Sequence, residues 1–235
     1  MSARRDIVPA SFVNLAPGPL VHGLTLGEMA RYVNQRLDNP ARLRVISMTG
    51  WRRSMTWNDT GRAWVPPSPN LRSPEAALAY AGVALLEATN VSEGRGTESP
   101  FLVFGAPWLR LSEFDDPGSA LEAAGFRLSP TEFKPVAEPA APNPKYADEV
   151  CRGFRIEVTR TENVEAYRLG LELVVRLARQ EGFSWRRDGR ALTRLLGTTT
   201  VYDALASRRS VAEVLAADTA DHARWLSERR TALLY

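Results

Sequence analysis

The spacing of apolar residues predicts a first helix near the start of the chain. Thr25 is followed three residues later by Glu28, which is the pattern of a capping box at a helix start. Apolar residues then recur three or four positions apart, at Leu26, Met29, Ala30, Val33 and Leu37. They predict one buried helix face, and the Asn39-Pro40 pair ends the helix because proline cannot continue it.

Three further helical regions show the same kind of signal. Ser73-Pro74-Glu75 combines an N-cap serine, a proline in the first turn and an acid at the positive end of the helix dipole. The helix that follows runs to Ala88, and its small residues predict close packing. An amphipathic helix is expected over residues 164–180, with one stripe of Tyr167, Leu171, Val174 and Ala178. The tail, residues 201–234, is predicted as short helices with apolar positions at Val211, Val214, Leu215, Trp225 and Leu226.

Short runs of β-branched and aromatic residues predict the strands. Residues 43–48 (LRVISM) are expected to form a buried strand, and residues 101–104 a second one. Residues 154–159 (FRIEVT) alternate between apolar and polar, as a half-buried strand does. Residues 61–70 carry three prolines and are therefore extended and stiff, and residues 130–144 are predicted as a proline-rich surface connection.

The order of these elements predicts the fold class. Strands among helices indicate an α/β or α+β fold, in which a mixed sheet packs with helices. We divide the 235 residues into a lead-in segment with its helix, residues 1–40, and one α/β domain, residues 41–235.

Composition and charge narrow the classes of protein. The net charge is only +3 and no basic run is present, so we expect no nucleic-acid partner. Cys151 is the single cysteine, which excludes an intrachain disulfide and indicates a buried apolar role. His22 and His222 are far apart in sequence, so we expect no metal and no cofactor. No segment resembles a signal peptide or an apolar span of roughly 20 residues, which predicts a cytoplasmic protein without a membrane span.

The strongest candidate for chemistry is the loop of residues 90–97, called the 90–97 loop below. It carries an amide, two hydroxyls, a carboxylate and a guanidinium, on Asn90, Ser92, Thr97, Glu93 and Arg95. Glycines on both sides of Arg95 allow positive φ and close approach of a backbone or a ligand. Two interpretations stay open: a site for an anion or a sugar, or a tight turn in which Glu93 and Arg95 pair.

Other side chains extend the candidate site. Glu87 and Glu93 are the candidate catalytic residues, because two nearby carboxylates can supply the acid and base that cleave a glycosidic bond. Ser68 and Asn70 offer polar groups from the stiff proline segment, although a plain turn is the alternative. His22 precedes the first helix, where it can act chemically or simply satisfy backbone groups. Four tryptophans near these loops, Trp51, Trp57, Trp64 and Trp108, can stack on sugars or fill a core.

A series of motifs then occurs in order along the chain. They are residues 22–28 (HGLTLGE), 50–53 (GWRR), 64–70 (WVPPSPN), 86–97 (LEATNVSEGRGT), 100–101 (PF), 105–108 (GAPW), 145–146 (KY), 151–153 (CRG), 229–230 (RR) and 233–235 (LLY). This series resembles the NamZ-type, or YbbC-like, exo-β-N-acetylmuramidases, a family long known only as a domain of unknown function. The resemblance covers nearly the whole chain, and the string from Ser92 to Thr97 is its most specific part.

The resemblance implies a bacterial hydrolase that releases terminal β-linked N-acetylmuramic acid from muropeptides during cell-wall recycling. Family members place a Rossmann-like domain before this region and can be exported. The chain thus corresponds to the family's carboxy-terminal half, with the amino-terminal domain and its probable catalytic glutamate absent. Activity is expected to need that domain, and three alternatives stay open: a fragment, a gene truncated at its start, or a subunit that pairs with a separately encoded first domain.

Within that picture, the residues of this chain are expected to bind substrate. Arg95 would clamp the lactyl carboxylate of muramic acid, while Asn90 and Asn70 would bind its acetamido and hydroxyl groups. A non-catalytic sugar-binding module, a pseudoenzyme and a structural interaction protein remain the alternatives.

Overall fold

The computed structural model describes residues 18–114, 118–162 and 164–235 of the chain. Its sheet has three strands in the order β1-β3-β2, and both pairings are antiparallel. The strands are β1 (Val103–Ala106), β2 (Phe126–Phe133) and β3 (Cys151–Val158). Of the two fold classes expected, the structure has the α+β arrangement, with an antiparallel sheet in place of a mixed one.

The central strand is the one whose alternation the sequence shows best. Phe154 and Ile156 of β3 are buried, and Phe154 lies opposite Phe104 of β1 in the register. Cys151 at the start of β3 is buried as expected, and burial raises the pKa of its thiol to about 12. The predicted strands at 101–104 and 154–159 are therefore confirmed, each shifted by a few residues.

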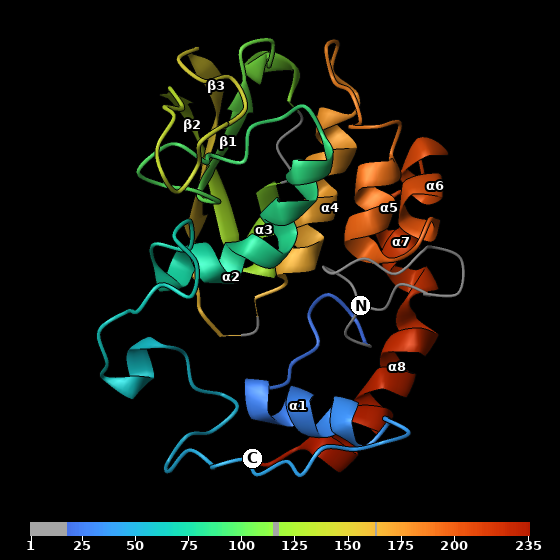
Figure 1. The fold of residues 1–235 in the computed structure, drawn as a ribbon. Coiled ribbons are helices and arrows are strands. Elements are labelled where there is room, and N and C mark those ends of the chain that lie inside the picture. Colours follow the sequence, from blue (N-terminus) through green and yellow to red (C-terminus); the bar gives the residue numbers. More distant parts are fainter. Residues whose placement is uncertain (1–17, 115–117, 163) are drawn as a thin grey trace.

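Helices α2 (Pro74–Val83) and α4 (Ala166–Leu177) pack against each other beside the sheet (Figure 1). Two glycines allow the close contact, because a Cβ added to Gly82 would lie 1.8 Å from the carbonyl oxygen of Ala166. A Cβ added to Gly170 would lie 2.4 Å from the carbonyl oxygen of Gly82. The close packing expected of the small residues is confirmed. The last turn of the predicted helix is instead a tighter 3₁₀ helix, η2 (Ala84–Ala88).

The remaining elements complete two unequal parts. The larger part contains the sheet, α2, α4 and the main hydrophobic core, and adds η3 (Leu111–Glu113), α3 (Gly118–Ala124), α5 (Arg190–Leu196), α6 (Thr200–Ala206) and α7 (Val211–Ala217). The smaller part is drawn below it in Figure 1 and contains α1 (Leu26–Asn34), η1 (Asn58–Thr60), α8 (Thr219–Glu228) and η4 (Arg229–Ala232). A second cluster of buried apolar residues, Tyr32, Trp225 and Ala232, joins α1 to the end of the chain.

The buried strand predicted at residues 43–48 is wrong. The segment has no regular structure, and Ile46 is 85% exposed. A strand needs a neighbouring strand to satisfy its backbone groups, and within the described residues only the N–H groups of Leu43 and Met48 in this run find partners. The β-branched residues of this run favour an extended backbone, but no neighbouring strand among the described residues pairs with it.

Two further predictions need correction. The first helix forms with its capping box, but it buries Glu28 and Tyr32, and Leu26 is 88% exposed. The carboxylate of Glu28 lies inside because Thr25, Leu234 and Arg53 all donate hydrogen bonds to it. The proline-rich connection also begins later than expected, because residues 130–133 belong to β2. Since β2 is an edge strand, it tolerates Pro130.

Candidate functional site

The 90–97 loop follows η2 and is fixed by backbone contacts on both sides. Ser92 pairs with Gly105 of β1 through two backbone hydrogen bonds of 2.8 and 3.0 Å. Gly94 and Gly96 have φ values of +81° and +78°. A Cβ at either position would lie within 2.7 Å of a backbone carbonyl oxygen, that of Val103 or Val136. The two glycines are thus required by close backbone packing of the loop itself.

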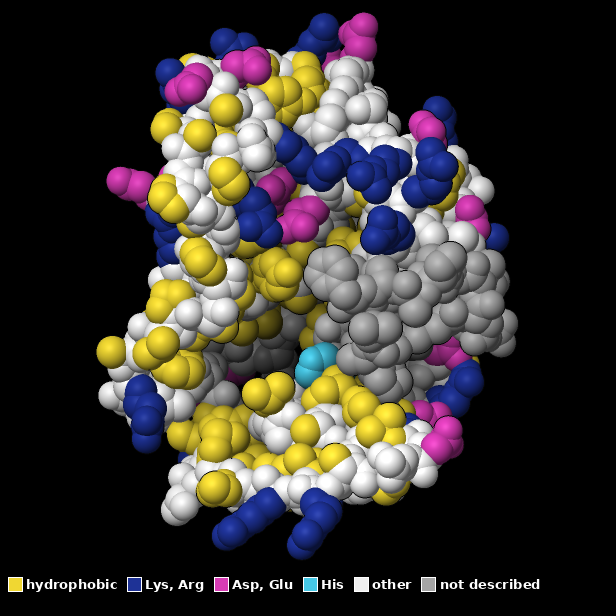
Figure 2. All heavy atoms as spheres, in the orientation of Figure 1, with side chains coloured by type: hydrophobic (Ala, Val, Ile, Leu, Met, Phe, Trp, Pro, Cys, Tyr) yellow, Lys and Arg dark blue, Asp and Glu magenta, His cyan; other side chains and the backbone are white. Residues whose placement is uncertain are grey.

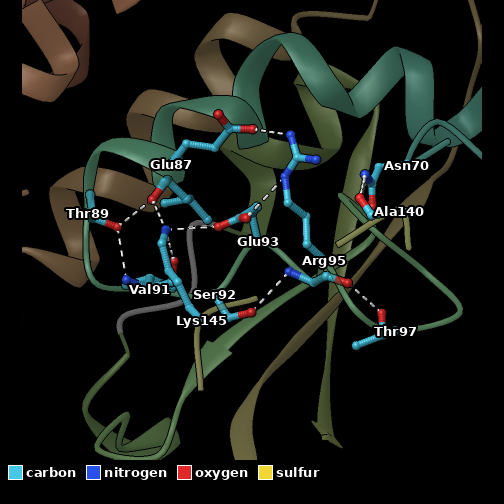
Figure 3. A network of polar contacts seen from close by, with 12 residues as sticks. Asn70, Glu87, Thr89, Val91, Ser92, Glu93, Arg95, Thr97, Ala140 and Lys145 are labelled. Atoms are coloured by element: carbon cyan, nitrogen blue, oxygen red, sulfur yellow. Dashed lines mark hydrogen bonds and ion pairs between the residues drawn. The ribbon is translucent and has the colours of Figure 1, made fainter. Parts of the chain in front are cut away.

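Four charged side chains form a continuous network on this loop (Figure 3). Arg95 lies between two carboxylates: its Nη2 is 2.7 Å from Oε1 of Glu87, and its Nε is 3.4 Å from Oε1 of Glu93. The other oxygen of Glu93 lies 2.9 Å from Nζ of Lys145. The pairing of Glu93 with Arg95, one of the two interpretations left open by the sequence, is therefore present.

Lys145 fastens the base of the loop. Its ammonium group donates to the carbonyl oxygens of Leu86 and Val91, at 2.8 and 2.7 Å, in addition to Glu93. Burial lowers the pKa of Lys145, and the neighbouring Glu93 carboxylate opposes this shift. All three donors of the ammonium are used, so Lys145 has a structural role at this site.

The two candidate catalytic carboxylates differ in exposure. Glu93 is only 4% exposed, whereas the side chain of Glu87 is 32% exposed. Both lie at the loop, and both contact the same guanidinium. Carboxylates that contact a guanidinium in this way orient Arg95, an arrangement that suits binding.

The other polar side chains of the loop contact the protein itself. The amide of Asn90 donates to the carbonyl oxygen of Gly182 at 2.7 Å and accepts from the N–H of Ser184 at 2.9 Å. The hydroxyl of Ser92 accepts from the N–H of Gly94, and that of Thr97 donates to the carbonyl oxygen of Gly94. Thr97 also lines a shallow cavity of about 400 Å³ on the outer side of the loop.

Asn70 lies beside the network, and Ser68 precedes it in the proline segment. The N–H of Leu71 donates to the carbonyl oxygen of Ser68 at 2.9 Å, so the turn that the sequence left open as the alternative is present here. The amide nitrogen of Asn70 donates to the carbonyl oxygen of Ala140 at 2.7 Å (Figure 3). Its Oδ1 is buried and has no hydrogen-bond partner among the described residues. A buried polar atom without a partner is costly, so this acceptor is a place where a ligand or water group is expected.

His22 lies in the smaller part of the molecule, away from the loop. Its Nδ1 accepts from the N–H of Leu24, and its carbonyl oxygen accepts from Nε1 of Trp225. Burial and then the charge of Arg229 lower the pKa of His22. These contacts fit the helix-entry role that the sequence left open.

Sequence reasoning did not select three residues that build the site. Lys145 was noticed only within a motif, although it is one of two lysines in a chain whose cations are otherwise arginine. Tyr146 donates its hydroxyl to the carbonyl oxygen of Asn90 at 2.7 Å, and Arg186 donates to that of Glu87 at 3.1 Å. Both come from segments more than fifty residues away, and no local pattern indicates such contacts.

Two kinds of feature are absent from the described residues, a cluster of metal ligands and a membrane-crossing helix. Within them, no group of three or more His, Cys, Asp or Glu side chains is arranged to hold a metal ion. In the same part of the chain, no helix is both long and apolar enough to cross a membrane.

Comparison with known proteins gives the family. The model described as "Exo-beta-N-acetylmuramidase NamZ, C-terminal" matches residues 78–235, and the corresponding N-terminal model matches residues 5–75. The chain belongs to the NamZ family. The two NamZ models meet next to the start of α2, whereas our division at residue 40 stays a prediction.

Relatives of the NamZ family support the same assignment. The chain is 36% identical over 165 residues to the peptidoglycan β-N-acetylmuramidase NamZ of Bacillus subtilis (strain 168), which is 70% of this chain and 38% of that protein. Two DUF1343 family proteins from Bacteroides fragilis NCTC 9343 share the fold. The first has a TM-score of 0.69 and 28% identity, and the match covers 92% of this chain and 56% of that protein. The second has a TM-score of 0.78 and 23% identity, and the match covers 96% of this chain and 59% of that protein. The chain thus spans well under two thirds of the length of these relatives.

Proposed function

We propose that this chain supplies the substrate-binding half of a peptidoglycan glycosidase of the exo-β-N-acetylmuramidase type. The position of Arg95 is the observation that best supports the proposal. Its Nε and Nη2 are held by Glu93 and Glu87, the ring of Phe101 lies 4.9 Å from the guanidinium carbon, and Nη1 has no partner among the described residues. An oriented, 31% exposed guanidinium with a free donor suits the lactyl carboxylate of N-acetylmuramic acid.

The local charge balance favours an anion in spite of the two carboxylates. Arg95, Lys145 and Arg186 face Glu87 and Glu93, which leaves one excess positive charge around the loop. Figure 2 shows basic side chains gathered in a band next to a pair of acidic ones on this half of the molecule. A bound carboxylate would neutralise that excess.

The acetamido group of the sugar is assigned to Asn70. Its Oδ1 is buried and lacks a donor among the described residues, so the N–H of an acetamido group would satisfy it once the segment that covers Asn70 moves aside. Asn90 and Ser92 act indirectly, by holding the shape of the loop through the contacts described above. Thr97 lines the outer cavity, and its hydroxyl already donates to the carbonyl oxygen of Gly94 and accepts from the N–H of Ser99, so a direct substrate contact by Thr97 stays a prediction. Direct substrate contacts by Ser68 and His22 remain predictions.

Hydrolysis is proposed to need more than this chain. Because Glu87 and Glu93 are both ion-paired, we assign catalysis to the intact enzyme with its Rossmann-like amino-terminal domain, and Glu87 and Glu93 remain only candidates for part of the acid and base pair. The same pairing favours a second candidate function, a sugar-binding module without catalysis. In either case the proposed setting is muropeptide recycling in a bacterial cytoplasm.

Two measurements on the purified chain test the proposal. Calorimetric titration should detect binding of N-acetylmuramic acid, and a chromogenic β-N-acetylmuraminide should be hydrolysed slowly or not at all. Absence of binding would refute the assignment of the substrate-binding half. Rapid turnover would instead place the catalytic carboxylates in this chain, and Glu87→Gln and Glu93→Gln would then identify them.

A further inference from the structure

A second cavity lies at the opposite end of α2 from the 90–97 loop. It has a volume of about 480 Å³ and is enclosed by residues 53–58 and 64 on one side and by the first turns of α2 with residues 161–162 on the other. Figure 2 shows a recess bordered by hydrophobic side chains between the two parts of the molecule. Because α2 rises about 1.5 Å per residue, its ten residues separate this cavity from Glu87 by roughly 15 Å.

Two tryptophans form one wall of the cavity. The rings of Trp57 and Trp64 lie 5.0 Å apart at an angle of 85°. Their N–H groups are already used, since Trp57 donates to the carbonyl oxygen of Arg62 and Trp64 to that of Leu71. The surface that remains for a ligand is therefore aromatic ring, which packs well against the C–H face of a pyranose.

The rim of the cavity carries polar groups that contact nothing else. The side chains of Ser54, Asn58, Thr161 and Glu162 line it and have no hydrogen bond or ion pair with any described residue. They offer hydroxyl, amide and carboxylate groups, which is the set that binds sugar hydroxyl and acetamido groups.

The charge of the rim selects against an anionic sugar. Among the described residues, Arg53 is the one cation that lines the cavity, and its guanidinium is held by the buried carboxylate of Glu28 at 2.6 Å and by the carbonyl oxygen of Gly23. Glu162 is exposed and unpaired, so a ligand carboxylate would meet a like charge here. An uncharged sugar fits, and muramic acid does not.

We infer that this cavity binds one uncharged N-acetylhexosamine unit of a glycan strand, stacked on Trp57 and Trp64. The choice of a glycan as the ligand rests on the proposed function, whereas the ring surface and the free rim groups are independent of it. Its distance from Glu87 corresponds to about three pyranose units, which makes it a distal contact for a longer strand.

Titration of the full chain with triacetylchitotriose, an uncharged N-acetylglucosamine trimer, tests the inference. Binding is followed by the indole N–H signals of Trp57 and Trp64 in two-dimensional NMR. Asn58→Ala should weaken binding about threefold to tenfold, the effect of one hydrogen bond, and Trp57→Ala by about tenfold or more. Because Asn58 is exposed and its side chain has no other contact, its substitution does not threaten folding.

Matched controls separate this site from the rest of the molecule. Glu149→Gln changes an exposed carboxylate elsewhere and should leave chitotriose binding unchanged. Arg95→Ala should also leave it unchanged while weakening muramic acid binding. Absence of chitotriose binding, or binding that Asn58→Ala and Trp57→Ala do not alter, would overturn the inference. Loss of muramic acid binding alone would count only against the proposed function.

Discussion

Glu93 is contacted by two cations from opposite sides, and the rest of their contacts differ. Lys145 also donates hydrogen bonds to two backbone carbonyl oxygens, and its side chain is largely buried. Nη1 of Arg95 has no partner among the described residues, and the side chain is partly exposed. A lysine provides a compact point charge and an arginine a planar fork, so the loop uses Lys145 to hold itself and Arg95 to face a ligand.

Replacing Arg95 by alanine should weaken binding of N-acetylmuramic acid by about one to two decades. A charge-assisted contact between arginine and carboxylate contributes roughly 1.5–3 kcal/mol, and each 1.4 kcal/mol is tenfold in affinity. Binding of N-acetylglucosamine, which lacks the lactyl group, should hardly change. Calorimetric titration of both sugars measures this. Equal losses for the two sugars would mean that Arg95 only holds the loop together.

Replacing Lys145 by methionine should destabilise the fold by about 3–5 kcal/mol. The change leaves two carbonyl oxygens without their donor and Oε2 of Glu93 without its cation, while Arg95 still contacts Oε1, and breaking a buried ion pair from one side has a cost of this size. Urea unfolding of the variant measures the loss. The double variant Lys145→Met, Glu93→Gln should recover part of it, because the buried carboxylate that loses Lys145 is replaced by an uncharged amide. Additive losses would show that the pair is not coupled.

Asp218 should make the fold less stable as the pH rises from about 4 to 6. Burial raises the pKa of its carboxyl group to about 6, so the folded state holds this proton more tightly than the unfolded state. Below both pKa values the group is neutral in both states and has no effect. Above them the folded state contains a buried charge, at a cost of up to about 3 kcal/mol at 1.36 kcal/mol per pKa unit.

The variant Asp218→Asn isolates this effect. Its stability relative to the parent should rise from near zero at pH 4 to its full value by pH 7, as measured by thermal or urea unfolding across the range. A difference that does not change with pH would contradict the assignment to Asp218.

At the scale of elements, the contact between α2 and α4 places the site. Helix α2 continues directly into η2, which carries Glu87, and the carbonyl oxygens of Leu86 and Glu87 in η2 accept hydrogen bonds from Lys145 and Arg186. Because Gly82 and Gly170 let the two helices approach closely, they determine where η2 lies relative to the 90–97 loop. The glycines are therefore structural requirements of the site without touching it.

Substituting Gly82 by alanine should destabilise the protein by about 1–3 kcal/mol or more. Alanine favours a helix by up to about 1 kcal/mol over glycine, but its Cβ would overlap the backbone of Ala166, and overpacking costs more than that gain. Gly27→Ala is the matched control in a helix, because its Cβ would meet only the side chain of Val45. A melting temperature lower for Gly27→Ala than for Gly82→Ala would disprove the packing argument.

Local signals predicted the elements well and their partners poorly. Neighbouring residues determine the helix caps at Thr25 and Ser73, the alternation of β3 and the apolar stripe of α4. The structure contains all of these features. The sequence also led to the 90–97 loop and to the acids around Arg95. Lys145 and Arg186 were missed because their contacts depend on chain topology, and the segment at 43–48 was misjudged because strand propensity cannot reveal whether a neighbouring strand exists.

At the scale of the whole molecule, the first described helix is held by the last residues of the chain. Tyr32 packs on Trp225 and donates its hydroxyl to Glu228, while the backbone N–H of Leu234 donates to the buried carboxylate of Glu28. The smaller part of the molecule is therefore built from both ends of the described chain.

A variant that stops at Glu228 should lose the order of α1 and keep the sheet. It removes the N–H of Leu234 and the buried Ala232, but it leaves every residue of the larger core in place. Hydrogen exchange followed by mass spectrometry should show fast exchange over α1 and unchanged protection over β3. Tyr235→Phe, which removes only the hydroxyl that accepts from Met48, is the control. Protected α1 amides in the shortened chain would contradict this dependence.

The hydrogen bond between Glu28 and Leu234 also affects the order in which the segments of the protein fold. Residues joined across 206 positions can meet only after the segment between them has left the ribosome. Helix α1 is thus synthesised well before the segment that holds it and docks only after that segment appears, and such distant contacts slow folding. Until then, the apolar side chains near it have no cover, and during that interval the nascent protein is most exposed to aggregation and most dependent on chaperones.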